Sequence, residues 1–281
     1  MKISEFLWNE FVYGGHWFSI SASSIVFSIM LILNIVIKWE FLFIIYFLMQ
    51  CVYNYNHYKE IHIDFISNPD RPNHLRNYLR ALPIITFFYG FLLFLLIIYF
   101  GNIPSIVLSI LLLILGLSFT HFFKKLTKQI IGFKNFFASF TLGSLVIFTT
   151  LYCSHEINIF VFELFLLLSL RFVISSSISD IKDIKNDKKQ NLTTFPIYFG
   201  RKKFLTFLHI INFITFIPFF IFLIKNSYSF VPFLIFTYVY TFYYIEKAKK
   251  PKINENSLVN IIVDGEFIFW PFMIISGILL I

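Results

Sequence analysis

The chain has 281 residues, of which 58% are hydrophobic and 14% charged, and its mean hydropathy is +0.78. These values lie outside the range of soluble globular domains and predict an all-α integral membrane protein in contact with the lipid bilayer. The net charge of +8 is accounted for by basic loops beside anionic lipid headgroups, so nucleic acid is excluded as an expected partner.

Nine apolar runs follow one another along the chain, each long enough to cross a hydrocarbon core about 30 Å thick. We expect a bundle of about nine transmembrane helices that forms a single domain over residues 1–281. The first run is too long for a signal-peptide core and is expected to be retained. The runs cover residues 16–37, 39–59, 81–100, 103–120, 134–152, 157–179, 203–224, 228–246 and 258–281.

The basic residues predict the orientation of this bundle, because Lys and Arg collect on the cytoplasmic side of a membrane. Twenty of the 23 Lys and Arg residues lie at the amino terminus or after the second, fourth, sixth and eighth runs. The amino terminus is therefore expected to be cytoplasmic and the carboxyl terminus external. The expected location is the inner or plasma membrane.

The first acidic cluster ends the second run with the sequence "NHYKEIHID". Asn56, Glu60 and Asp64 are four residues apart, so a helix places them on one face, with His57 at its border. The segment "NPDRPNHLR" follows, and its prolines favour a stiff turn that presents Arg71.

The second acidic cluster follows the sixth run in "SDIKDIKNDKKQNLTTFPIYFG", where Asp180, Asp183 and Asp187 again share one helix face. Carboxylates on adjacent turns repel one another unless a cation lies between them, and Mg²⁺ prefers hard oxygen ligands completed by water and phosphate. Two such faces on the same membrane side predict a metal-bridged diphosphate site. The alternative is that these acids only balance Lys59, Lys182, Lys185 and Lys188.

A third segment, "HFFKKLTKQIIG", follows the fourth run and supplies cations for phosphate oxygens that a metal leaves free. In these three segments the chain resembles the UbiA-type family of intramembrane prenyltransferases. That family carries NDxxDxxxD at the first cluster and DxxDxxxD at the second, and "KKLT" and "TTFPIYFG" also resemble family segments. Two departures stand in the first motif, where His57 and Glu60 replace aspartates.

The resemblance implies transfer of an isoprenoid chain from an allylic prenyl diphosphate to a hydrophobic or aromatic acceptor, with Mg²⁺ as cofactor. It assigns the metal to Asn56, Glu60, Asp64, Asp180, Asp183 and Asp187, of which all but Asp180 are expected to be catalytic, and the diphosphate to Arg71, Lys124, Lys125 and Lys182. Asp180 has a second expected role, the orientation of Lys182 and Arg71. His57 is an alternative ligand, a general base or a plain polar residue.

Two other functions stay open at this point. A terpene cyclase of the same family would ionise the diphosphate without any acceptor, and a transporter would be a different class of protein altogether. Three intramembrane charges, Arg171, Asp264 and Glu266, are left out of the expected catalytic set. They pair with one another, line the acceptor pocket or make structural polar contacts, and these alternatives stay open. Cys51 and Cys153 show no metal spacing and are expected to be unpaired thiols.

Overall fold

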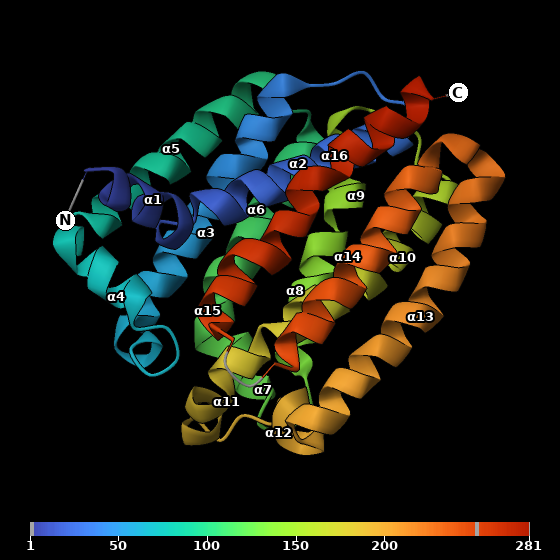
Figure 1. Cartoon of the computed structure of the whole chain (residues 1–281). Helices are drawn as coiled ribbons and strands as arrows, with labels where there is room; N and C mark the ends of the chain where they lie inside the picture. The colour runs from blue at the N-terminus through green and yellow to red at the C-terminus, as the bar shows by residue number, and fades with distance from the viewer. Residues whose placement is uncertain (1–2, 251–252, 281) are drawn as a thin grey trace.

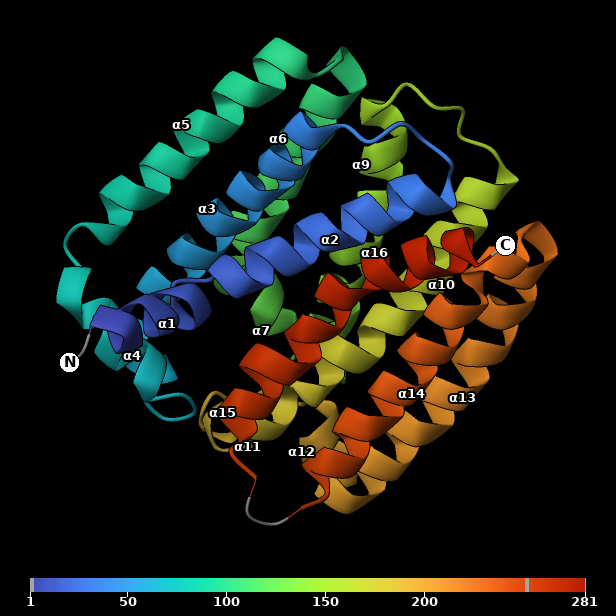
Figure 2. The same ribbon diagram turned by 45° about the horizontal axis from the view of Figure 1, so that its top comes forward.

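The computed structural model describes residues 3–250 and 253–280, and every regular element in them is a helix. Long helices stand side by side in one bundle, with α5 (Leu82–Phe100) along one edge and α13 (Arg201–Asn226) along the opposite edge (Figure 1). Between them α2 (His16–Ile32) packs against α16 (Asp264–Leu279), as Figure 2 shows from a second direction. The all-α expectation is confirmed.

The other helices alternate between long spans and short end pieces. In the first half these are α1 (Ile3–Tyr13), α3 (Trp39–Asp64), α4 (Asp70–Leu75), the 3₁₀ turn η1 (Arg76–Tyr78), α6 (Ile103–Ser118), the π-helix η2 (Phe119–Phe123) and α7 (Lys124–Leu126). In the second half they are α8 (Phe133–Gly143), α9 (Leu145–Tyr152), α10 (Ile159–Ile178), α11 (Asp180–Lys189), α12 (Phe195–Phe199), the 3₁₀ turn η3 (Tyr228–Phe230), α14 (Val231–Ala248), α15 (Glu255–Ser257) and the π-helix η4 (Leu258–Val263).

Seven helical stretches among the described residues are long and apolar enough to cross a membrane, and an eighth arises if α1 and α2, bent by 51°, count as one. The expected count of nine is therefore not reached by length and composition. Two helices account for the difference. Alone, α2 has only 17 residues, while the second half of α3 carries Gln50, Asn54 and the acidic cluster.

Two helices end at other residues than the apolar runs that predicted them. The first run ends five residues early, at Ile32, and Asn34 then takes a left-handed conformation with φ 54°. The second run continues as helix to Asp64, so the first acidic cluster lies entirely on α3. Helices α11, α12 and α15 gather at the lower end of the bundle in Figure 1, which places the second cluster at that end.

Aromatic side chains fill much of the core of the bundle. Phe172, Phe233 and Trp270 are almost fully buried, and the Phe233 and Trp270 rings meet edge to face at 5.2 Å. One close approach matters for the site. A Cβ atom on Gly116 would lie 2.7 Å from Val52, so this glycine allows α6 to lie directly against α3.

Candidate functional site

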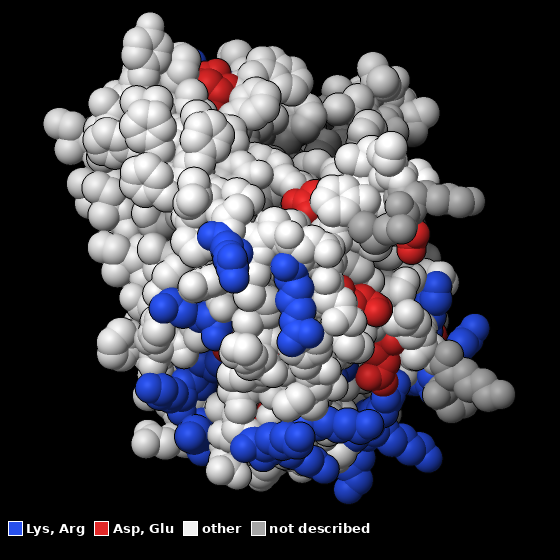
Figure 3. All heavy atoms as spheres, turned by 90° about the vertical axis from the view of Figure 1, so that its left-hand side faces the viewer, with Lys and Arg blue, Asp and Glu red and all other residues white. Residues whose placement is uncertain are grey.

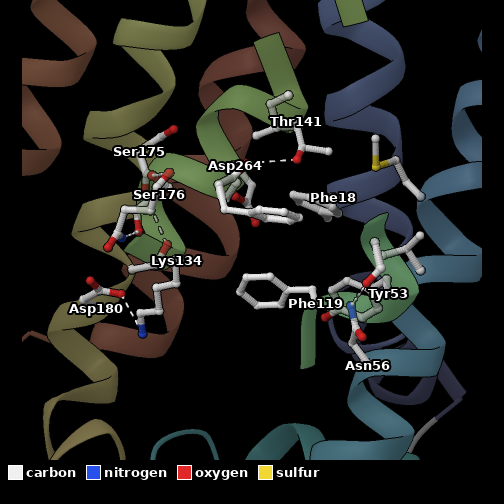
Figure 4. Close-up of a pocket in the computed structure, with 18 of the residues that line it drawn as sticks. Phe18, Tyr53, Asn56, Phe119, Lys134, Thr141, Ser175, Ser176, Asp180 and Asp264 are labelled. Carbon is white, nitrogen blue, oxygen red and sulfur yellow. Dashed lines mark hydrogen bonds and ion pairs between the residues drawn. The ribbon is translucent and has the colours of Figure 1, made fainter. Parts of the chain in front are cut away.

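A cavity of about 390 Å³ opens between the two acidic helices and continues into the apolar interior. Asn56 and His57 line it from α3, and Asp180 and Asp183 line it from α11 (Figure 4). Lys134 and Asn135 line it from α8, and Lys134 is paired with the α11 carboxylate of Asp180. Apolar side chains form most of the remaining wall: Phe18, Met49, Val52, Phe119, Phe137, Ala138, Leu142 and Phe267.

The α3 wall is held by contacts to α6 and to the segment after it. The amide nitrogen of Asn56 donates to the Gly116 carbonyl at 3.2 Å, and Thr120 donates to the Asn56 oxygen at 3.0 Å. One turn further along α3, Glu60 accepts a hydrogen bond from Lys124 at 2.5 Å. Glu60 thus faces Lys124 and does not line the cavity.

His57 stands between an acid and a guanidinium. Its Nδ1 lies 2.8 Å from Asp64 Oδ2 and donates to it, while Arg71 Nη1 lies 3.2 Å from His57 Nε2. Arg71 also reaches Asp64, at 3.6 Å. Both ring nitrogens of His57 therefore have partners, and Asp64 is neutralised inside the protein.

The opposite wall contains a buried lysine that no sequence motif indicated. Lys134 Nζ lies 3.0 Å from Asp180 Oδ1 and 2.7 Å from Asp187 Oδ2. Burial raises the pKa of Asp180 to about 7 although Lys134 opposes that shift, and Asp180 Oδ2 has no hydrogen-bond partner. Asp183 faces the cavity without an ion pair to any described residue. The carboxylates of Asp180 and Asp183 would therefore accept a further positive charge.

Asn260 on η4 orients two of the predicted cations. Its side-chain oxygen accepts from Lys182 at 3.0 Å and from Arg71 at 3.2 Å. The expectation that Asp180 orients these two residues is wrong, because Asp180 is paired with Lys134. Burial lowers the pKa of Lys182, and the positive charge of Arg71 beside it adds to that effect.

Hydrogen bonds join the "KKLT" and "TTFPIYFG" segments beside Lys134. The Thr127 carbonyl in "KKLT" accepts from Thr193 N at 2.9 Å, and its hydroxyl accepts from Lys134 N at 3.2 Å. Gly132, with φ 67°, donates to the Thr193 carbonyl at 3.0 Å, and a side chain there would collide with Phe195. These bonds fix Lys134 against α11.

The structure brings together some of the predicted residues and leaves others apart. Asn56, His57, Asp180 and Asp183 line the cavity, whereas Glu60, Asp64, Asp187, Arg71, Lys124 and Lys182 form the charged layer behind them. Lys125 is exposed and makes no ion pair within the described residues. Among the described residues, the clustered acids form no ion pair with Lys59, Lys182, Lys185 or Lys188. These four lysines therefore do not neutralise the acids by direct pairing.

The three intramembrane charges have different surroundings. Arg171 donates to Asn212 at 2.6 Å and to Thr241 at 3.0 Å, and Thr241 in turn donates to Glu266 at 3.4 Å. This buried network links α10, α13, α14 and α16 away from the cavity. Asp264 lines the cavity. Cys51 and Cys153 are free, as expected.

A bundle of membrane-length helices with charged groups at the mouth of an apolar cavity defines a multi-pass integral membrane protein suited to a ligand with an anionic head and an apolar tail. The chain belongs to the UbiA prenyltransferase family, whose sequence model matches residues 15–261. The resemblance drawn from the sequence motifs is confirmed.

Solved structures with the same fold include two UbiA homologues. A UbiA homologue from Aeropyrum pernix in its apo form has a TM-score of 0.70 at 18% identity, with 92% of this chain and 97% of that chain covered. A UbiA homologue from Archaeoglobus fulgidus bound to GPP and Mg²⁺ has a TM-score of 0.63 at 16% identity, with 95% and 99% covered. A structure described for digeranylgeranylglyceryl phosphate synthase has a TM-score of 0.60 at 20% identity, with 99% and 100% covered. No curated protein matches the chain.

Proposed function

We propose that the protein transfers an isoprenoid chain from an allylic prenyl diphosphate to an aromatic or lipid acceptor in a Mg²⁺-dependent reaction. One observation carries this proposal: carboxamide and carboxylate oxygens of α3 and α11 face each other at the mouth of a cavity whose interior is apolar. An anionic diphosphate bridged by cations fits the mouth, and an isoprenoid chain fits the interior.

The comparisons support the donor and the cofactor. GPP and Mg²⁺ are bound in one similar structure and DMAPP and Mg²⁺ in another, and a third similar chain is a digeranylgeranylglyceryl phosphate synthase. GPP and DMAPP share an allylic diphosphate joined to an apolar chain. The same ligand class matches the cavity between Asn56 and Asp183.

The donor set here fits Mg²⁺. Asn56, Asp180 and Asp183 offer hard oxygens from two helices, and one of the Asp180 oxygens is buried without a partner. Among residues 3–250 and 253–280, no three His, Cys, Asp or Glu side chains are grouped closely enough to hold a metal ion by themselves. That arrangement suits an ion whose shell is completed by water and diphosphate oxygens. Glu60, Asp64 and Asp187 would support these ligands from behind.

When bound, Mg²⁺ would neutralise charge that develops on the departing diphosphate. The chain's own cations add to that neutralisation, because three of them lie around the acidic walls. They are Lys134 and the two residues that donate to Asn260, which are Arg71 and Lys182. Deeper in the cavity, aromatic rings exclude water and favour an allylic cation through their π faces. These rings belong to Phe119, Phe137 and Tyr53. The acceptor then attacks this cation.

We also propose the placement of the protein in its membrane. Nine crossings require α3 and α2, which has only 17 residues, to span in addition to the seven apolar stretches, and residues 1–281 then form one transmembrane domain. Lys and Arg gather over the lower part of the face in Figure 3, the end at which α11 and α12 lie. A cytoplasmic amino terminus, a cytoplasmic active site and residence in an inner or plasma membrane agree with that distribution.

Product analysis tests the proposed reaction. Purified protein receives labelled geranyl, farnesyl or geranylgeranyl diphosphate with Mg²⁺, with and without pooled aromatic and glycerolipid acceptors. Transfer predicts label in a prenylated acceptor and diphosphate release that depends on the acceptor. Label in a cyclic hydrocarbon without acceptor would instead establish a cyclase, and vesicle uptake without diphosphate release would establish a transporter.

A further inference from the structure

Asp264 is the cavity carboxylate that the proposed donor site does not use. It begins α16, directly after the π-helix η4, and it lines the cavity. Its backbone carbonyl accepts from Ser21 at 2.8 Å, and Gly265 beside it packs closely against Trp17. These contacts with α2 fix the backbone at Asp264, whose side chain lines the cavity.

The Asp264 carboxylate makes no hydrogen bond or ion pair with any residue that the structure describes. Its electrostatic neighbours are Lys182 and Arg71, both of which donate to Asn260 instead. A carboxylate inside a membrane protein is costly unless it finds a donor, and such residues commonly serve function. The missing donor is therefore expected to come from a ligand.

The depth of Asp264 in the cavity indicates which part of the ligand it meets. In Figure 4 it lies in the upper half of the view with Thr141 and Phe18, whereas Lys134, Asp180 and Asn56 lie in the lower half. A diphosphate held by the lower group places its allylic carbon just above them. Asp264 then lies near that carbon, at the depth at which an acceptor hydroxyl must meet it.

We propose that Asp264 is a catalytic residue that binds a hydroxyl group of the acceptor and takes its proton, so that the acceptor class is an alcohol or a phenol. This inference rests on the proposed prenyl transfer. The donor C–O bond breaks with its electron pair leaving on the diphosphate, the hydroxyl oxygen forms the new C–O bond, and the hydroxyl proton passes to the Asp264 carboxylate. The carboxyl then loses it to water.

His57, which also lines the cavity, is less suited to this role. Asp64 occupies its Nδ1 and Arg71 approaches its Nε2, so neither nitrogen is free to accept from an acceptor. Asp264 has both oxygens available. A hydroxyl also suits its surroundings better than an anionic head group, because a second negative charge beside Asp264 would be repelled.

The test separates donor ionisation from proton removal. Wild type, Asp264→Asn and Asp264→Glu are compared with Glu163→Gln, a charge-matched control at an exposed position on α10. Each receives geranylgeranyl diphosphate and Mg²⁺ with 4-dodecylphenol, with dodecanol, or with azide, an anion that traps a cation without losing a proton. Binding of the non-ionising thiolo analogue of the donor is measured in parallel.

For Asp264→Asn we expect transfer to the two hydroxyl acceptors to fall by about 100-fold or more. Azide trapping should not fall below the wild-type level, because the substitution removes a negative charge that repels the anion, analogue binding should stay within about threefold of wild type, and Asp264→Glu should recover part of the transfer. Hydroxyl transfer at the wild-type rate in Asp264→Asn, or azide trapping that falls in parallel with it, overturns the inference. So does a wild type that forms the azide product but uses neither hydroxyl acceptor, whereas a wild type that releases no diphosphate overturns the proposed function as well.

Discussion

Asp183 and Glu60 carry the same charge but differ in where they point. Asp183 faces the cavity, whereas Glu60 is held by Lys124 in the layer behind it. We predict that Asp183→Asn lowers kcat/KM for the prenyl diphosphate by about 100-fold or more, because it removes a carboxylate that would hold the Mg²⁺ that neutralises the diphosphate. Glu60→Gln should cost roughly tenfold, the usual scale for a supporting residue. Steady-state kinetics at saturating Mg²⁺ measure both; equal losses would contradict this ranking.

Lys134 is the counter-charge of the α11 wall. Lys134→Met leaves Asp180 and Asp187 without their cation, which should lower the free energy of unfolding by about 3 kcal/mol in EDTA. Mg²⁺ should then restore more stability to the variant than to wild type, because a divalent cation replaces the lost ammonium. Thermal unfolding across a Mg²⁺ titration measures this. Parallel titration curves for the two proteins would show that Lys134 does not take the place of a bound cation. Lys128→Met, at an exposed position, is the control.

Some site residues were visible in the sequence because they belong to spaced acidic motifs. Asn56, Asp180 and Asp183 line the cavity, whereas Glu60, Asp64 and Asp187, expected on the same helix faces, lie in the charged layer behind it. Lys134 and Asn260 were not foreseen, since each acts through partners more than 45 residues away in the chain. The available signal was weaker: a lysine and an asparagine, neither in a motif, near the start of an apolar run.

At the scale of helices, the Arg171 network ties the carboxyl-terminal half of the bundle together. Arg171→Met removes the donor for Asn212 and the partner of Thr241, so Glu266 stays buried without its neighbouring positive charge. We predict a loss of about 2 kcal/mol in the free energy of unfolding. The double variant Arg171→Met, Glu266→Gln should recover part of that loss. Unfolding in detergent measures both, and a single variant as stable as wild type would argue against the network.

Helix ranges were predictable wherever apolar length alone decides them, as in α5 and α10. The polar half of α3 was also placed on one helix by its four-residue spacing. The π-helices η2 and η4 were not predictable, because they depend on packing against other helices and not on local propensity. Both of them lie beside the site, where η2 places Thr120 and η4 places Asn260.

For the whole molecule, the basic loops predict that α11 and α12 face the cytoplasm. In a Cys51→Ala, Cys153→Ser background, a thiol placed by Lys189→Cys should react with a membrane-impermeant maleimide only after the cells are opened. A thiol placed by His155→Cys, between α9 and α10, should react in intact cells. Both positions are exposed. The reverse labelling pattern would contradict the proposed orientation.

If the cavity between α3 and α11 ionises an allylic diphosphate, purified protein must release diphosphate from geranylgeranyl diphosphate when an acceptor is present, and this release is measured in Mg²⁺ and in EDTA. We expect release in Mg²⁺ by wild type and by Glu163→Gln, and little release in EDTA or from Asp183→Ala and Asn56→Leu. Release by folded protein that is indifferent to Mg²⁺ and to both substitutions would contradict this role of the cavity.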